Sequence, residues 1–244
     1  MRSAKLLVAL AATGLVATSA FAQKSAFDGF YGQIATGYEN NDVGSLNTTG
    51  REAGKPADTW NAGSQSFGGA PLVVGLGYNF SVAPKWLVGI GVDYSALSQK
   101  SSTYSSSLRG AGTLSGQSIE TSNRMNIFIT PGYEIDKDKL VYLKAGYSSV
   151  TAKANAPTYY TDATDPRQSG PVRGLSNQTS TVGGYIVGLG YKQIITGGFY
   201  GFAEGNYMSY NKQSYSSTTA DGYKVSTNPS LSSYQLLVGV GYKF

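Results

Sequence analysis

The chain is dominated by segments in which every second residue is apolar or aromatic. In residues 234–244 the alternating set is Tyr234, Leu236, Val238, Val240, Tyr242 and Phe244. Side chains alternate across a strand, so this segment has one apolar face and one small or polar face. Aromatic residues at both ends of the apolar face, with aliphatic residues between them, are typical of a strand that crosses a bilayer.

The same alternation recurs in seven other segments. They are residues 30–38, 72–80, 86–94, 125–135, 141–147, 184–191 and 199–207. None of the apolar faces carries Asp, Glu, Lys or Arg. A Lys or Arg that faces lipid at mid-bilayer costs about 2–4 kcal/mol, so this exclusion is expected of lipid-facing positions. Strands of about ten residues, tilted by about 45°, span the hydrocarbon core.

The connections between these segments alternate strictly between short and long. The short ones are 81–85, 136–139 and 192–198, and the long ones, rich in Ser, Thr, Asn and Gly, are 39–69, 96–122, 149–181 and 210–231. Short periplasmic turns and long outer loops are typical of an even-stranded barrel. The sequence therefore predicts an all-β protein, an eight-stranded antiparallel up-and-down transmembrane β-barrel.

The first residues have the features of a cleaved signal peptide. Arg2 and Lys5 precede an apolar run to Ala17, and Ala20 and Ala22 place small residues before Gln23. The run is too short for a transmembrane helix, although a retained membrane anchor is the alternative. We expect a signal peptide over 1–22 and one outer-membrane barrel domain over 23–244.

Composition excludes several classes of function. The chain has no His and no Cys, which removes the usual general base and the commonest metal ligands. The formal charge is +5, but Lys and Arg are not clustered, so nucleic acid is not an expected partner. We expect no catalytic, cofactor-binding or metal-binding residues.

Four charged residues fall on the opposite, inward faces: Asp93, Glu134, Lys144 and Glu204. We expect them to be structural charges of the barrel interior, with an ion pair between Lys144 and Glu204. A conduction path and a catalytic set are the alternatives. Inward glycines in pairs such as Gly75 and Gly77 do not complete a nucleotide-binding motif. They are expected to make room for large side chains, including Phe128, Tyr142 and Tyr200.

Two further features concern aromatic residues and proline. Pro131, on an outward face, predicts a local bulge. Several aromatic residues lie in the long connections: Trp60, Phe67, Tyr104, Tyr159, Tyr160, Tyr215 and Tyr223. They are expected to pack one loop on another, with a contact surface for a partner as the alternative.

Particular residues give the chain a resemblance to a family. It resembles the small outer-membrane barrels of the OmpA-like and OmpX-like kind through Gly29–Ile34, Pro131–Tyr133, Ala203–Glu204 and the final Gly-Tyr-Lys-Phe. The resemblance implies that Gly239, Tyr242 and Phe244 form the signal read by the barrel-assembly machinery, with Leu237 a mild departure. It covers 27–244, and we expect no peptidoglycan-binding domain after Phe244.

Three functions compete for such a barrel. We expect a non-enzymatic, plugged outer-membrane protein of a Gram-negative bacterium, whose four long surface loops serve envelope integrity, adhesion or another surface interaction. A narrow, porin-like passive channel for small solutes is the alternative, and an outer-membrane enzyme is disfavoured by the absent His. The expected surroundings are outer-membrane lipid and lipopolysaccharide, and the surface ligand is unknown. Uniformly lipid-like outward faces predict a monomer.

Overall fold

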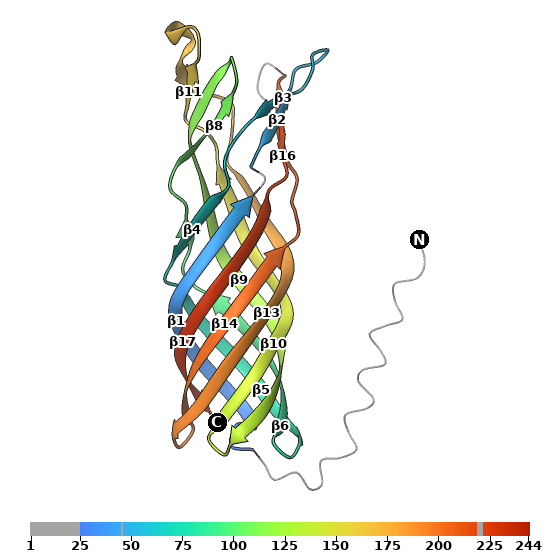
Figure 1. The fold of residues 1–244 in the computed structure, drawn as a ribbon, viewed down its shortest axis with the longest axis vertical. Helices are drawn as coiled ribbons and strands as arrows, with labels where there is room; N and C mark the ends of the chain where they lie inside the picture. The colour runs from blue at the N-terminus through green and yellow to red at the C-terminus, as the bar shows by residue number, and fades with distance from the viewer. Residues whose placement is uncertain (1–24, 45, 219–221) are drawn as a thin grey trace, which may run out of the picture.

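Eight strands close into a ring. The computed structural model describes residues 25–44, 46–218 and 222–244, so the segment 1–22 that we predict to be a signal peptide lies outside the described residues. The ring strands are β1 (Gly29–Gly44), β5 (Leu72–Ala83), β6 (Trp86–Ser95), β9 (Gly112–Asp136), β10 (Lys139–Asn155), β13 (Gln178–Thr196), β14 (Phe199–Tyr210) and β17 (Ser230–Lys243). Each pairs antiparallel with the next, and β17 pairs with β1 (Figure 1). The predicted eight-stranded antiparallel barrel is confirmed.

Three short turns and the C-terminus lie at one end of the barrel (Figure 1). The prediction for the third turn was too long, because β13 continues to Thr196 and β14 begins at Phe199. Gly197, with a φ of 54°, supplies the left-handed residue of the two-residue turn. Lys192 and Ile194 therefore belong to the strand, where they continue its inward face.

The outward faces are those that the alternation predicts. Phe30, Leu189 and Leu236 are 66%, 62% and 63% exposed. At the short-turn end, ring contacts join neighbouring strands: Phe30 with Tyr78, Trp86 with Tyr133, and Phe199 with Tyr242. A second set of exposed tyrosines marks the other end: Tyr38, Tyr94, Tyr147, Tyr185, Tyr207 and Tyr234. The two sets form the aromatic girdles that flank a lipid-facing band.

Inward glycines make room for aromatic rings, as predicted. A Cβ built on Gly190 would overlap the ring of Tyr142, its partner across the strand pair. Gly91 stands in the same relation to Phe128. In the narrow interior, a large aromatic side chain on one strand thus lies opposite a glycine, which has no side chain, on the next strand.

The prediction of a bulge at Pro131 is wrong. On both sides of this residue the β9–β10 register is unchanged, with Tyr133 opposite Val141 and Ile129 opposite Ala145. Pro131 has no N–H to donate, so pairing lapses locally without inserting a residue. The β9–β10 register shifts elsewhere, between Ser149 and Thr151 and at the short turn.

The four long connections hold much more strand than the sequence analysis assigned to them. The ring strands β1, β9, β10 and β13 run on into them. Among the residues that the structure describes, the connections also hold nine short strands: β2 (Thr48–Arg51), β3 (Asp58–Trp60), β4 (Gln65–Gly69), β7 (Gln99–Lys100), β8 (Tyr104–Leu108), β11 (Tyr159–Asp162), β12 (Gly170–Pro171), β15 (Tyr215–Thr218) and β16 (Lys224–Thr227). One 3₁₀ turn, η1 (Pro166–Gln168), lies near the tip. Within the described ranges no helix is long and apolar enough to cross a membrane.

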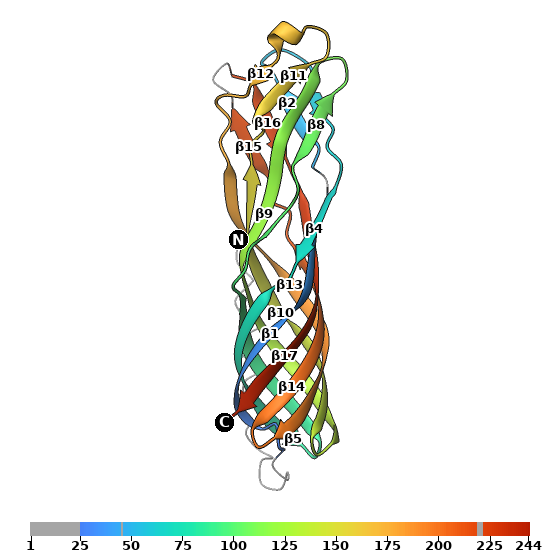
Figure 2. The same ribbon diagram turned by 90° about the vertical axis from the view of Figure 1, so that its left-hand side faces the viewer.

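These strands build an extension above the barrel (Figures 1 and 2). One sheet has the order β15-β16-β2-β3, and β8 and β11 pair with the upper part of β9. A bridge between Asn61 and Ser107 joins the two groups. We use "outer extension" for this part, because long connections of such barrels lie outside the cell.

The apolar face changes sides at the upper girdle. Below it apolar residues point outward, whereas above it they point inward and form a buried cluster: Val43, Leu46, Phe67, Ile119, Val150, Val182, Ile186, Met208, Tyr210 and Leu231. Above the lipid, the strands meet water on the outside and must bury their apolar side chains within. This core explains why the strands continue beyond the barrel.

Candidate functional site

The lower interior holds a buried group of three charges. Lys144 Nζ, from β10, lies 2.7 Å from Asp93 Oδ2 on β6 and 2.8 Å from Glu204 Oε1 on β14. The side chain of Lys144 is 1% exposed and each carboxylate 4%. The contact between Lys144 and Glu204 was expected from the sequence, and the second carboxylate, Asp93, makes the group a triad.

Neutral side chains complete the surroundings of the triad. Tyr142 donates a hydrogen bond to Glu204 Oε2 at 2.7 Å, and Asn206 Nδ2 donates to Oε1 at 2.7 Å. Asn126 Nδ2 donates to Asp93 Oδ1 at 2.5 Å. Lys144 Nζ also lies 4.0 Å from the centre of the Phe128 ring. Both buried carboxylates thus accept several hydrogen bonds, as buried charges require.

A second buried cation, Lys192 of β13, lies below the triad. Its Nζ is 4.1 Å from the ring centre of Tyr31, 5.1 Å from that of Tyr200 and 5.2 Å from that of Tyr142. Three ring faces attract a cation electrostatically and shield it from water. The lower interior therefore contains two lysines and two carboxylates, so its formal charge is balanced.

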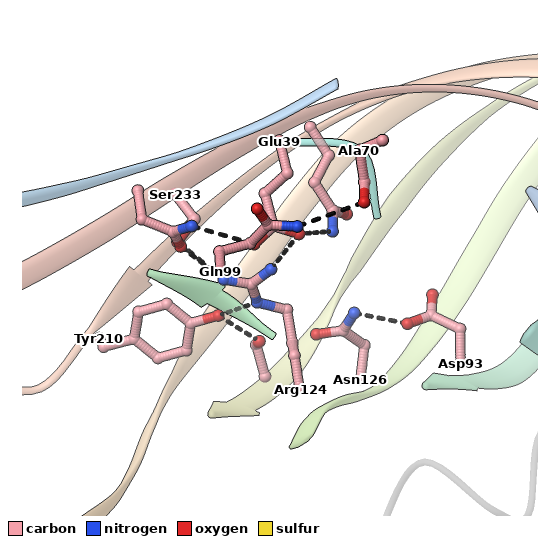
Figure 3. Close-up of polar contacts among 11 residues, drawn as sticks. Glu39, Ala70, Asp93, Gln99, Arg124, Asn126, Tyr210 and Ser233 are labelled. Carbon is pink, nitrogen blue, oxygen red and sulfur yellow. Dashed lines mark hydrogen bonds and ion pairs between the residues drawn. The ribbon is translucent and has the colours of Figure 1, made fainter. Parts of the chain in front are cut away.

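A separate polar layer centres on Arg124 of β9 (Figure 3). Its Nη1 lies 2.5 Å from Glu39 Oε2, and Nη2 donates to Asn41 Oδ1 at 2.8 Å and to Ser233 Oγ at 3.0 Å. Nε donates to the hydroxyl of Tyr210 at 2.9 Å. The guanidinium thus spans the interior from β1 to β14 and β17.

Arg124 keeps the inward alternation of β9, and a bulge lies directly beside it. The register of β9 on β10 shifts between Ser149 and Thr151, and the neighbouring Asn123 has a φ of 50°. Arg124 is 2% exposed and keeps four polar partners.

Three of the buried charges, Glu39, Arg124 and Lys192, were not predicted from the sequence. All three follow from the inward alternation when each strand is continued by a few residues: Gln33 to Glu39, Phe128 to Arg124, and Gly190 to Lys192. They were missed because Glu39 and Lys192 were assigned to connections and Arg124 lay just beyond the predicted end of its strand.

The other residues singled out from the sequence lie apart from these layers. Glu134 is half-buried at the short-turn end, where it accepts a hydrogen bond from the hydroxyl of Ser25. Tyr242 and Phe244 are 39% and 74% exposed on the lower girdle. Gly239 faces inward, against the ring of Phe202.

Most aromatic residues of the outer extension serve its packing. Trp60 and Phe67 are buried, and Trp60 Nε1 donates to the Tyr223 hydroxyl at 3.3 Å. The rings of Trp60 and Tyr160 lie 6.3 Å apart. Tyr159 is 43% exposed. Packing of one loop on another, the favoured alternative, describes most of this set.

Asp162 organises the tip between β11 and η1. Its carboxylate accepts hydrogen bonds from the backbone N–H groups of Asp165 and Thr164, and from the hydroxyls of Tyr160 and Thr164. These four donors lower the pKa of Asp162 to about 2, the backbone donors contributing most. The tip is thus held by one carboxylate in its ionised form.

The described part of the chain contains no group of three or more His, Cys, Asp or Glu residues that could hold a metal ion. Its six buried charged side chains are Glu39, Asp93, Arg124, Lys144, Lys192 and Glu204. Five of them form ion pairs with one another and the sixth lies among aromatic rings. Their arrangement is that of a packed polar interior.

Comparisons with solved structures find other outer membrane proteins, and the likeness of fold is carried by OprG. OprG, an outer membrane protein of Pseudomonas aeruginosa, is 15% identical with a TM-score of 0.55, over 90% of this chain and 98% of that one. The attachment invasion locus protein Ail of Yersinia pestis is 16% identical with a TM-score of 0.37, over 89% and 99%. The outer membrane protease OmpT of Escherichia coli is 12% identical with a TM-score of 0.44, over 91% and 99%. At these identities the likeness concerns the fold alone.

Comparison with families of sequences identifies the chain. A search of curated proteins finds no match. The family described as outer membrane protein beta-barrel domain matches residues 8–244, nearly the whole sequence. With its eight-stranded ring and two aromatic girdles, the chain belongs to this family and is an outer membrane protein of a Gram-negative bacterium.

Proposed function

We propose that this protein is a non-enzymatic, closed barrel that carries its outer extension as a surface for interaction outside the cell. The observation that carries the proposal is the separate apolar core of the extension. A chain that needed only to close a barrel would end its strands near the upper girdle. Strands continued on a core of their own hold a surface away from the membrane.

Closure of the barrel is supported by its interior. An eight-stranded barrel is only wide enough to be filled by side chains. Arg124 with its partners spans the interior at one level, and the triad with Lys192 fills it at another. An ion crossing this interior would have to separate buried ion pairs, which costs several kcal/mol for each uncompensated charge.

The non-enzymatic part of the proposal rests on chemistry. OmpT is a protease, but the likeness to it has a TM-score of 0.44 and carries no argument. The chain has no His to act as a general base. The buried carboxylates are already engaged by Lys144 and Arg124.

The two aromatic girdles indicate which molecules surround the barrel. We propose that outer-membrane lipid and lipopolysaccharide contact the exposed aromatic rings, and that the protein is a monomer because its outward faces are uniformly apolar. Gly239, Tyr242 and Phe244 are proposed to be read by the barrel-assembly machinery during folding. The residues that contact a surface partner are sought on the outer extension.

Single-channel conductance in a planar bilayer tests closure. The mature protein, refolded and shown to be folded by heat-modifiable migration on a gel, is expected to give no discrete current steps. A double variant, Lys144→Ala with Arg124→Ala, removes the central cation of each layer and is expected to conduct more than the unmodified protein, provided that it shows the same heat-modifiable migration. Discrete, salt-dependent steps in the unmodified protein would favour the narrow passive channel instead.

A further inference from the structure

The outer extension contains a cavity that none of the features above explains. Its volume is about 190 Å³. Val43, Ile119, Val182 and Leu231 form its lower end, and Trp60 and Ala152 are among its walls. Five ring strands, β1, β9, β10, β13 and β17, and three strands of the outer extension, β3, β8 and β16, contribute to its apolar lining.

The cavity has a closed lower end. Val43, Ile119, Val182 and Leu231 are each at most 9% exposed and pack in one cluster with Ile186 and Met208, which are both 0% exposed. Tyr210 of the same cluster accepts the hydrogen bond from Arg124. A molecule in the cavity therefore rests on a packed apolar floor, with the Arg124 layer beneath it.

Two of the amide side chains that line the cavity donate to neighbouring hydroxyls. Gln117 Nε2 donates to Ser106 Oγ at 2.9 Å, and Asn155 Nδ2 donates to Ser118 Oγ at 3.0 Å. The one charged residue of the lining, Lys153, follows inward Ala152, so alternation directs its side chain to the opposite face. A buried water needs two to four polar partners, which this wall provides poorly.

The cavity borders a gap between strands. The upper part of β13, from Gln178 to Gly183, pairs with β10 on one side, and pairing with β14 begins only at Gly184. In the part of the chain that the structure describes, β15 pairs with β16 alone. Gln178 and Tyr215, on these two unpaired edges, both line the cavity. The side chain of Tyr215 is hydrogen-bonded to that of Ser180 across this gap, so a molecule that enters from the side passes beside this one contact.

We propose that this cavity binds a small apolar molecule, of the size of a two-ring aromatic compound, taken from the external medium. A designed cavity of about 150 Å³, lined by Leu, Ile and Phe, stays dry and holds benzene. The present cavity is somewhat larger, is similarly apolar and is open at one side. Ala152 lies five residues above the girdle residue Tyr147 on β10, so the acyl chains of the membrane end below it.

This proposal is independent of whether the barrel conducts. Saturable binding is compatible with a silent barrel and with a leaky one, because the floor of the cavity is apolar packing and not the polar layers. Failure of either proposal is therefore visible without the other.

Energy transfer from Trp60 tests the proposal. The chain has two tryptophans, and Trp86 lies on the lower girdle. In the variant Trp86→Phe, held in a lipid nanodisc, Trp60 is the sole donor, and 1-aminonaphthalene is the fluorescent acceptor. We expect transfer that saturates with acceptor concentration, above a linear background from probe dissolved in lipid.

Two filling variants and one matched control decide the outcome. Ala152→Phe and Val225→Phe, each in the Trp86→Phe background, fill the cavity from two different strands, β10 and β16, and are expected to weaken binding at least tenfold. Ala145→Phe adds the same ring to the lipid-facing side of β10 and is expected to leave binding unchanged. Val225 belongs to the outer sheet, so its variant serves if Ala152→Phe fails to fold. Transfer without saturation, or saturation that both filling variants leave unchanged, overturns the proposal.

Discussion

At the scale of single residues, the buried triad changes how an ion pair in this barrel should be tested. Lys144 holds two carboxylates, so a double mutant of Lys144 and Glu204 would leave Asp93 as an uncompensated buried charge. Replacement can be near neutral only when all three charges are removed together. The three charges of the triad should therefore be replaced as one group.

The variant Lys144→Met is expected to lower the free energy of unfolding by about 3–5 kcal/mol, since two buried carboxylates lose their cation. The triple variant Lys144→Met, Asp93→Asn, Glu204→Gln is expected to recover part of that loss, because both carboxylates become neutral while buried Lys192 loses their balancing charge. Urea unfolding in lipid vesicles, followed by tryptophan fluorescence, measures both. Lys139→Met, which breaks a partly exposed pair with Asp136, serves as the control and should cost at most about 1 kcal/mol. A triple variant as unstable as the single one would contradict the expected compensation.

The sequence could assign the members of the triad to the interior but not their contacts. Alternation alone gives Asp93, Lys144 and Glu204 their inward side. However, β10 is separated from β6 by β9 and from β14 by β13, so the contacts run across the lumen. Their heights depend on strand tilt and stagger, which no local pattern encodes. For the same reason, the sequence does not predict that tyrosine rings surround Lys192.

At the scale of strands, pairs of glycine and aromatic residues fix which strands can lie side by side. Gly190→Ala is expected to destabilise the barrel by about 1–3 kcal/mol, because its Cβ would overlap the Tyr142 ring. Gly205→Ala is the matched control: its Cβ would lie 3.6 Å from Leu236 on the outward face. The two variants are compared by urea unfolding. Equal free energies of unfolding for the two variants would show that the Tyr142 ring can move aside, and would contradict the tight packing at Gly190.

The strands of the outer extension were not predicted from the sequence. Their Ser- and Thr-rich composition resembles that of loops, and the apolar residues that mark them, such as Val43, Val150 and Val182, are sparse. These residues lie on the face opposite to the lipid-facing set of the same strand. A search for a single apolar face along each strand stops at this inversion, so it ends the strand too early.

The tip between β11 and η1 is expected to loosen in acid while the barrel stays folded. The pKa of Asp162 is lowered to about 2, against about 3.9 in an unfolded chain. Its stabilising contribution is therefore complete above pH 4 and is lost as the pH falls toward 2. Hydrogen exchange of the Thr164 and Asp165 amides, measured across this range, should accelerate beyond the intrinsic dependence on pH. Asp162→Asn should show no such additional change.

At the scale of the whole molecule, the inversion of the apolar face locates the boundary of the membrane. Leu189→Arg is expected to cost about 2–4 kcal/mol, because residue 189 faces lipid near mid-bilayer. Thr181→Arg, on the same face of β13 but above Tyr185, should cost less than about 1 kcal/mol, since the residue is exposed to water. Unfolding in vesicles measures both, and equal costs would place the boundary elsewhere.

The strands β9, β10 and β13 continue from the barrel into the outer extension, so their length sets the height of the extension above the membrane. A strand rises about 3.3 Å per residue, so removing two residues from each arm of the β9–β10 and β13 pairings would lower the tip by about 7 Å, less the tilt, with every side chain on its original face. Removing one residue would turn the faces inside out. The height of this surface above the lipopolysaccharide can therefore change only in steps of two residues per strand. The lengths of these strands in natural versions of the chain should differ by even numbers of residues.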